Sequence, residues 1–289
     1  MEGNNISQNV FNSINDIFSK IFNSIDENIY NILDDITFIN SDIIENSKIK
    51  QIIGINSSEG ILLICNALIL GTILYYSINY LISHLTLSKV QPVSQFIFRL
   101  IIFAIIMNTS IWVCMQIIDI ISIITNAIRQ IGEDLFKESI CFSNFIEIIN
   151  EKIYLEEDLN LFSFNGVIKS FVTFGFVSLI FSNALRYIMI QVFIIISPFS
   201  FITLINTKTE CFFKKWITSF LALLIEQILI SVILILAFSM EKSIDENIVK
   251  ILYVGIIYGL TKSNIFMNQL IGGISTTVNI GINSMKTLK

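Results

Sequence analysis

Charged residues are scarce in this sequence of 289 residues. They make up 14% of the chain, whereas a soluble domain usually carries about 25%. Hydrophobic residues make up 54%, and the mean hydropathy is +0.75. So few charges cannot cover the surface of a water-soluble globule of this size, and the composition therefore excludes most soluble enzymes.

Histidine and clustered cysteine are also nearly absent. The only histidine is His84, which excludes a histidine-rich metal centre. The four cysteines, Cys65, Cys114, Cys141 and Cys211, are widely spaced and form no C-x-x-C pair. A disulfide framework or a zinc site needs clustered cysteines, so we interpret these as unpaired small hydrophobes. The net charge of −5 argues against a nucleic-acid-binding surface, which would be basic.

Motifs for nucleotide binding and nucleophilic catalysis are missing as well. The chain has no G-x-x-x-x-G-K-[ST], no G-x-S-x-G and no H-E-x-x-H motif. We find no candidate catalytic, cofactor-binding or metal-ligating residue. The sequence therefore predicts a protein that is not an enzyme and uses no cofactor.

Long apolar runs take the place of these motifs. Residues 60–87 contain no Asp, Glu, Lys or Arg, and a membrane-spanning helix needs about 20 apolar residues. Further apolar blocks cover residues 100–127, 167–206, 217–240 and, less regularly, 251–274. We predict an all-α, polytopic membrane protein with about five transmembrane helices plus an N-terminal amphipathic helix.

Polar stretches divide the chain into three parts. Residues 1–59 are mostly acidic and carry an apolar stripe at helical spacing, formed by Phe11, Ile14, Phe18, Ile21, Ile25, Ile29, Ile32 and Ile36. This stripe predicts either an amphipathic helix that lies on a membrane surface or packs on a partner helix, or an ordinary helix that packs on the rest of the protein. The transmembrane domain covers residues 60–274, with an acidic connection at 128–166, and residues 275–289 form a basic tail.

The charges of the connections predict the orientation, because Lys and Arg are enriched in cytoplasmic connections. The connection at residues 84–99 has Lys89 and Arg99 and no acidic residue, so we place it inside the cell. The acidic segments at 1–59 and 128–166 then lie outside, and the basic tail lies inside.

The block at residues 167–206 allows two interpretations. At about 1.5 Å per residue it would extend roughly 60 Å, about twice the thickness of the hydrocarbon core. Two helices with a tight turn near Asn183 to Arg186 would place the basic stretch at 206–216 outside. One long helix that bends at Pro198 places it inside, and we prefer this interpretation.

Three ionisable residues lie deep in the apolar blocks: Asp119, Arg186 and Glu226. A charge at the centre of a bilayer costs from about 2.5 to more than 10 kcal/mol, so each should face protein or water. They fit an ion or proton path with Arg186 as counter-ion, a structural Arg186–Glu226 pair, or an Arg186 that is wetted at a turn. We favour the structural interpretations, because the internal repeat typical of a coupled transporter is not evident.

One stretch of about 50 of the 289 residues resembles a known family. An apolar helix ends at Ser197 and Pro198, and after a short polar connection an aromatic and basic stretch precedes the next long helix. That stretch consists of Phe212, Phe213, Lys214, Lys215 and Trp216. The pattern resembles the TrbL-like family, the polytopic inner-membrane subunit of conjugation and type IV secretion systems. On physical grounds alone, Pro198 bends the helix, and Trp216 with its lysines suits an interfacial anchor.

The resemblance implies a scaffold and channel subunit of a conjugative transfer machine that moves DNA or protein across the plasma membrane. It also implies partners: other subunits including a cytoplasmic ATPase, further copies of the chain, and the substrate in transit. The small size and the acidic N-terminal segment resemble the versions in Gram-positive bacteria. The alternative is a secondary transporter of small solutes or ions that uses Asp119, Arg186 and Glu226.

Overall fold

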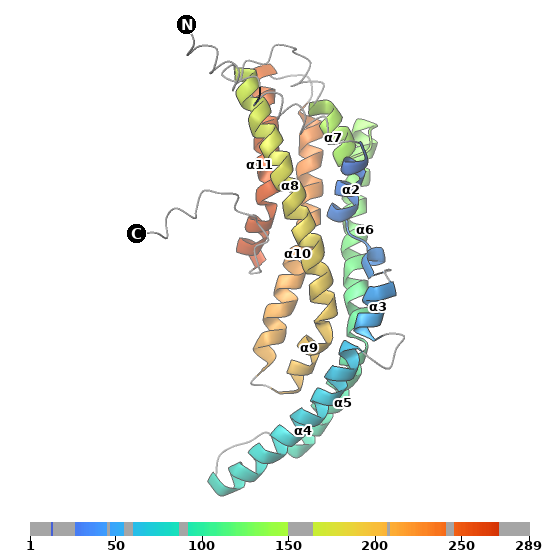
Figure 1. The fold of residues 1–289 in the computed structure, drawn as a ribbon, viewed down its shortest axis with the longest axis vertical. Coiled ribbons are helices and arrows are strands. Elements are labelled where there is room, and N and C mark those ends of the chain that lie inside the picture. Colours follow the sequence, from blue (N-terminus) through green and yellow to red (C-terminus); the bar gives the residue numbers. More distant parts are fainter. Residues whose placement is uncertain are drawn as a thin grey trace, which may run out of the picture.

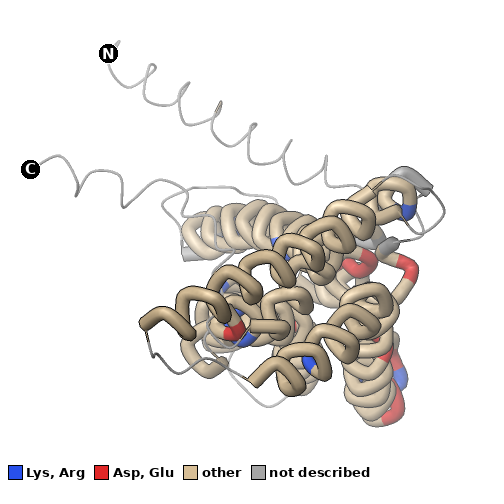
Figure 2. The backbone as a smooth tube through the Cα atoms, turned by 90° about the horizontal axis from the view of Figure 1, so that it is seen from below, with Lys and Arg blue, Asp and Glu red and all other residues tan. Residues whose placement is uncertain are grey.

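The computed structural model describes residues 13, 27–44, 47–54, 60–86, 92–149, 164–206, 209–240 and 246–271. All regular structure in these segments is helical, and they contain no strand. The predicted all-α class is therefore confirmed. Lys, Arg, Asp and Glu occupy only short stretches of the tube in Figure 2, and most of it is uncharged.

The helices follow one another along the chain. In order they are α2 (Glu27–Thr37), η1 (Ser41–Ile44), α3 (Ser47–Ile53), α4 (Ile61–Thr86), α5 (Val93–Asn108), α6 (Ser110–Phe136), α7 (Phe142–Ile149), α8 (Phe164–Ile195), α9 (Ser197–Ile202), η3 (Thr203–Ile205), α10 (Glu210–Ser239) and α11 (Glu246–Ile271). Five of them, α4, α6, α8, α10 and α11, are long and apolar enough to cross a membrane. This number matches the number of spans expected from the apolar blocks.

Four of these long helices form a bundle. α10 packs against α6 on one side and against α11 and α8 on the other, and α7 covers one end (Figure 1). α6 and α10 run in one direction through the bundle, whereas α8 and α11 run in the other. α11 is continuous from Glu246 to Ile271, so the imperfect apolar block near the C-terminus is one helix.

The fifth long helix, α4, pairs with the shorter α5 and extends beyond the end of the bundle at α9 (Figure 1). Only Cys65 and Ser83 are buried in α4. The sequence predicts one helix from residue 100, but the chain forms two, which meet at Thr109. The break is local to Thr109, whose backbone has φ −97° and ψ 4°. The side chains of Asn108 and Thr109 donate hydrogen bonds to carbonyl oxygens of α5 beside it.

The block at residues 167–206 forms a single long helix. α8 passes through Asn183 and Arg186 without a turn and ends at Ile195. Pro198 lies in the first turn of the short helix α9, where its missing N–H group removes no helical hydrogen bond. The preferred interpretation, one helix that breaks at Pro198, is therefore confirmed for the fold.

The N-terminal segment packs on the bundle. α2 contacts α7 and α8, η1 contacts α6, and α3 contacts α4. Leu33 is 1% exposed, and Ile36 packs against the same hydrophobic cluster, whereas Ile32 is exposed. Part of the predicted stripe, from Phe11 to Ile25, lies outside the described residues. For α2, the structure shows the second predicted alternative, a helix that packs on the protein.

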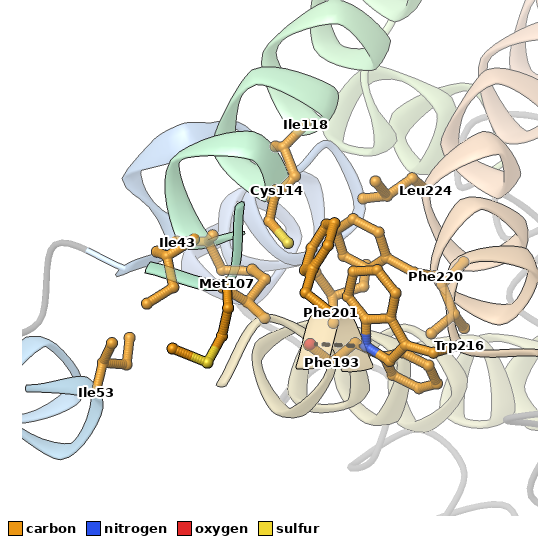
Figure 3. Packing of buried hydrophobic residues seen from close by; sticks show 14 of the residues in the cluster. Ile43, Ile53, Met107, Cys114, Ile118, Phe193, Phe201, Trp216, Phe220 and Leu224 are labelled. Atoms are coloured by element: carbon orange, nitrogen blue, oxygen red, sulfur yellow. Dashed lines mark hydrogen bonds between the residues drawn. The ribbon is translucent and has the colours of Figure 1, made fainter. Parts of the chain in front are cut away.

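Two hydrophobic clusters fill the molecule. One cluster lies under α7 and includes Phe142, Phe145 and Tyr253. The other surrounds Trp216, which is 4% exposed and donates a hydrogen bond from Nε1 to the carbonyl oxygen of Phe193 at 3.0 Å (Figure 3). The candidate functional site lies where the two clusters meet.

Candidate functional site

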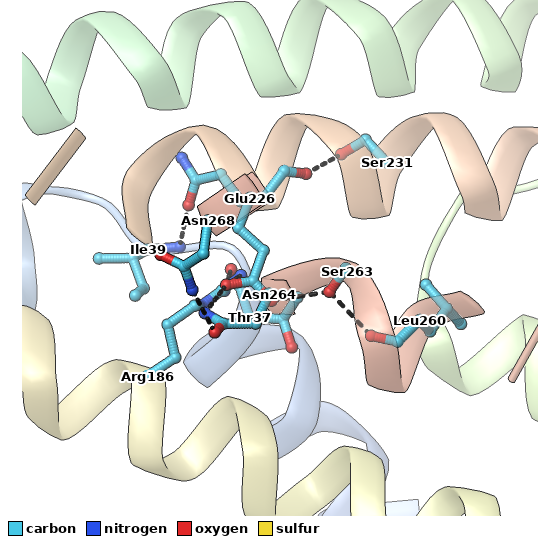
Figure 4. Close-up of polar contacts among 10 residues, drawn as sticks. Thr37, Ile39, Arg186, Glu226, Ser231, Leu260, Ser263, Asn264 and Asn268 are labelled. Carbon is cyan, nitrogen blue, oxygen red and sulfur yellow. Dashed lines mark hydrogen bonds and ion pairs between the residues drawn. The ribbon is translucent and has the colours of Figure 1, made fainter. Parts of the chain in front are cut away.

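Arg186 and Glu226 lie together at the centre of the bundle. They come from the middle of α8 and α10, and they are 1% and 2% exposed. Nη1 of Arg186 is 3.9 Å from Oε2 of Glu226 (Figure 4). Leu179 and Ile190 flank Arg186 on α8 and belong to different hydrophobic clusters, so the ion pair separates the two clusters.

Helix α11 satisfies the carboxylate of Glu226. Oγ of Ser263 donates to Oε1 at 2.7 Å, and Nδ2 of Asn264 donates to Oε2 at 2.8 Å. Nδ2 of Asn268 in turn donates to Oδ1 of Asn264 at 2.8 Å (Figure 4). Both oxygens therefore have a donor from protein, as a buried charge requires.

The N-terminal segment satisfies one nitrogen of the guanidinium group, whereas Nε and Nη1 of Arg186 are buried without a hydrogen bond to any described residue. Nη2 of Arg186 donates a hydrogen bond to the carbonyl oxygen of Thr37, the last residue of α2. The last carbonyls of a helix have no intrahelical partner and carry the negative end of the helix dipole, so they suit a cation. Close by, the N–H group of Ile39 donates to Oε1 of Gln227 at 3.0 Å (Figure 4).

These contacts join four parts of the chain into one polar network, which we define as Thr37, Arg186, Glu226, Gln227, Ser263, Asn264 and Asn268. Within the described residues, the two charged side chains are enclosed by protein and almost fully shielded from the surroundings. Because loss of one partner leaves an uncompensated buried charge, breaking such a pair usually costs about 3 to 5 kcal/mol. The geometry therefore fits a structural role for Arg186 and Glu226.

Asp119 is not part of this network. It lies on α6, is partly exposed, and makes no hydrogen bond or ion pair with the described residues. Trp112 and Ile123, on the same side of the helix, are 64% and 68% exposed. The structure thus brings together two of the three charges singled out in the apolar blocks.

The helix break and the aromatic stretch lie side by side. Ser197 and Pro198 are buried at the start of α9. Trp216 is also buried, with its ring centroid 5.4 Å from that of Phe220, so the contacts that it makes are packing contacts. Phe213 packs against Trp216 at 5.7 Å.

The neighbours of Trp216 in the aromatic and basic stretch face outward. Phe212, Lys214 and Lys215 are exposed on the first turns of α10. Lys214 forms an ion pair with Glu210 at 2.8 Å, one helical turn away. Of the predicted anchor, the two lysines are therefore exposed, whereas Trp216 itself is buried.

Sequence reasoning missed a second polar site, at the start of α7. Oδ1 and Oδ2 of Asp34 accept the N–H group of Phe142 at 3.0 and 3.2 Å. Burial raises the pKa of Asp34 to about 6, although the bond from Phe142 and the charge of Arg129 act in the opposite direction. Arg129 also donates from Nε to the carbonyl oxygen of Ile140 at 2.8 Å.

The polar partners of Glu226 were missed for a different reason. Ser263 and Asn264 interrupt an apolar block, and this interruption is a signal that the sequence does contain. No comparable signal links Thr37 to Arg186, because 149 positions separate them. The described residues contain no cluster of three or more His, Cys, Asp or Glu side chains that could hold a metal ion.

Comparison of the chain with protein-family models, curated proteins and solved structures finds no match. The class of this protein is therefore inferred from its fold and not from relatives. The chain is an all-α protein with five helices able to cross a membrane, which points to a multi-pass membrane protein. A buried ion pair joins three of these helices to the N-terminal segment.

Proposed function

We propose that this chain is an integral membrane scaffold and channel subunit of a conjugative transfer, or type IV secretion, machine. The observation that carries the scaffold role is the closed polar network around Arg186 and Glu226. It uses the intramembrane charges to hold helices together. The particular machine rests on the resemblance of the stretch from Ser197 to Trp216 to the TrbL-like family.

The same network weighs against the alternative, a secondary transporter of small solutes or ions. A path built on Asp119, Arg186 and Glu226 needs the three groups to lie along one route. Asp119 instead lies on an outer side of α6, while the other two are enclosed between α8, α10 and α11. We therefore favour the scaffold over the transporter.

The ends of the bundle support a location in the plasma membrane with the N-terminus outside and the C-terminus inside. The basic first turns of α10, with Lys214 and Lys215, lie at the same end as the α4–α5 pair (Figure 1). The acidic end of α6, with Glu133 and Asp134, lies at the opposite end beside α7. This separation follows the charge rule for membrane proteins. The inner end would meet a cytoplasmic ATPase.

Deletion of the gene tests the proposal directly. Transfer of DNA to recipient cells should be lost, growth on any single solute should be unchanged, and a plasmid copy should restore transfer. Cells that lose growth on one solute but keep normal transfer would support the transporter instead. Genes for a conjugative ATPase, relaxase or coupling protein beside this gene would add independent support.

The Glu226→Gln variant separates the two functions further. As a scaffold, this variant should transfer DNA in proportion to the amount of assembled protein in the membrane. As a proton or ion carrier, it should lose activity even when its amount is normal. Glu138→Gln, the same change at an exposed position outside the network, serves as the control.

A further inference from the structure

Two opposite charges inside the candidate spans have no charged partner. Asp119 is in the span of α6, and Lys262 is in the span of α11. Neither forms an ion pair or a side-chain hydrogen bond with any residue in the described part of the chain. Lys262 makes a cation–π contact with the ring of Tyr258, whose centroid is 5.6 Å from Nζ.

Both residues lie on outward sides of the bundle. Beside Lys262 on α11, Tyr258 is 64% exposed and Phe266 is 52% exposed. A Cβ atom added at Gly255 or Gly259, which share this side of α11, would meet no atom within 4 Å. This side of α11 is therefore open to close approach by another helix.

The two charges also lie on opposite sides of the bundle. α10 packs against both α6 and α11 and lies between them (Figure 1). Asp119 and Lys262 therefore cannot meet within one chain. Each would remain unpaired in an isolated copy surrounded by lipid.

The two charges occupy similar depths. The rings of Phe136 on α6 and Phe238 on α10 are 6.4 Å apart, so these two residues lie at about the same depth on two parallel helices. The bond from Ser263 to Glu226 places these two residues of α11 and α10 at about the same depth. At about 1.5 Å per residue, these pairs place Asp119 within roughly 5 to 10 Å of the depth of Lys262. The long lysine side chain can cover much of that distance.

We propose that copies of this chain associate head to tail in the membrane, with Asp119 of one copy paired with Lys262 of the next. One contact then satisfies both charges, each of which is costly to leave unpaired in hydrocarbon. A contact between two different surfaces repeats around an axis and closes into a ring when the rotation permits. This inference does not depend on the proposed function.

Charge reversal tests the contact in the full-length protein. The molar mass of the chain is measured in lipid nanodiscs or a mild detergent by light scattering and native mass spectrometry. The native chain should be oligomeric, and Asp119→Lys or Lys262→Asp alone should reduce the oligomeric fraction at least tenfold. The variant with both changes should recover it, because the pair is re-formed with its signs exchanged.

A mixture of the two single variants provides a second measurement. In each contact between an Asp119→Lys chain and a Lys262→Asp chain, one acidic and one basic side chain meet, so the oligomeric fraction should rise above that of either variant alone. Asp134→Lys, the same change at an exposed position on α6, should leave the mass unchanged. Helical content by circular dichroism confirms that each variant is folded.

Three results would overturn the proposal: a monomeric native chain, single reversals that leave the oligomer intact, or folded single variants that do not reassociate when combined. The readout is molar mass and not DNA transfer. A failure here is therefore distinct from a failure of the proposed function.

Discussion

Arg186 and Glu226 show how single residues determine the stability of this bundle. Each is almost fully buried, and each has partners from a different part of the chain: Thr37 for the guanidinium, and Ser263 with Asn264 for the carboxylate. Nη1 of Arg186 and Oε2 of Glu226 are 3.9 Å apart. Because each charge would be buried and unpaired without the other, the contribution of either residue to stability depends on the presence of the other.

We predict that Arg186→Met destabilises the protein by about 3 to 5 kcal/mol, because Glu226 then remains as an unpaired buried charge. Adding Glu226→Gln should recover part of this loss, since no charge remains and the amide oxygen can still accept the bond from Ser263, while the bond from Asn264 is lost. Thermal unfolding in detergent measures both. Equal losses in the single and double variants would contradict the coupling.

Asp34 is the second residue whose environment has a measurable consequence. Burial raises its pKa to about 6, above the ordinary value of 3.8, and this residue lies in α2, outside the candidate spans. Between these two pH values the folded state binds a proton that the unfolded chain releases. Asp34 therefore increases the free energy of unfolding as the pH falls through 6. This contribution is lost as the pH rises through 6 again.

The pH dependence can be isolated with Asp34→Asn. Between pH 7 and pH 4 the native chain should gain about 2 kcal/mol of stability relative to this variant, because only the native chain takes up the proton. The measurement is the difference in thermal midpoint between the two proteins across that range. A constant difference would show that Asp34 does not titrate on unfolding.

At the scale of the helices, two glycines report opposite environments. A Cβ atom at Gly175 of α8 would lie 2.4 Å from a methyl group of Ile257 on α11, and this methyl group is attached to the branched Cβ. At Gly71 of α4 there is no atom within 4 Å. The first glycine permits close packing of two helices, whereas the second has no packing role in the chain.

These glycines give a matched pair of substitutions. Gly175→Ala should destabilise the protein by about 1 to 3 kcal/mol, because Ile257 must move to make room. Gly71→Ala should be neutral or stabilising by up to about 1 kcal/mol, since alanine is the better helix former. Thermal unfolding compares the two. Similar losses at both positions would mean that helix α4 is packed against something in the assembled protein.

Much of the helical content follows from the apolar blocks, but the ends of helices do not. Within the acidic connection, the helical spacing of Phe142, Phe145, Ile146, Ile149 and Ile153 predicts a short helix at residues 140–155. The structure has α7 there, from Phe142 to Ile149. The junction at Thr109 was missed because it is a change of backbone angles at one residue inside an apolar block. Hydropathy does not register such a change.

At the scale of the whole molecule, orientation can be tested with cysteine chemistry. Cys211 is exposed at the end of the bundle near α9, and Ser139 is exposed beside α7 at the other end. Cys65 and Cys114 are buried. The two exposed positions therefore report the two sides of the membrane.

In a Cys141→Ser background, a membrane-impermeant maleimide should label Ser139→Cys on intact cells. It should label Cys211 only after the cells are permeabilised, because the basic end of the bundle is expected inside. A chain with Cys211→Ser gives the background signal. The reverse pattern would invert the proposed orientation.

The class of the protein and the number of its long apolar helices follow from the amino-acid sequence alone. Partition between water and lipid depends on how many apolar residues stand in a row, and composition along the chain is enough to count such runs. The single helix from Phe164 to Ile195 was within reach for the same reason, once charge was weighed against length.

Which of the charged side chains meet depends instead on the packing of the helices. Arg186 pairs with Glu226 and Thr37, while Asp119 and Lys262 point away from the bundle, although all four charged residues interrupt apolar helices. The outcome depends on the rotation and depth of helices that are distant in sequence. Those quantities are set by packing across the whole bundle, and no local pattern of residues encodes them.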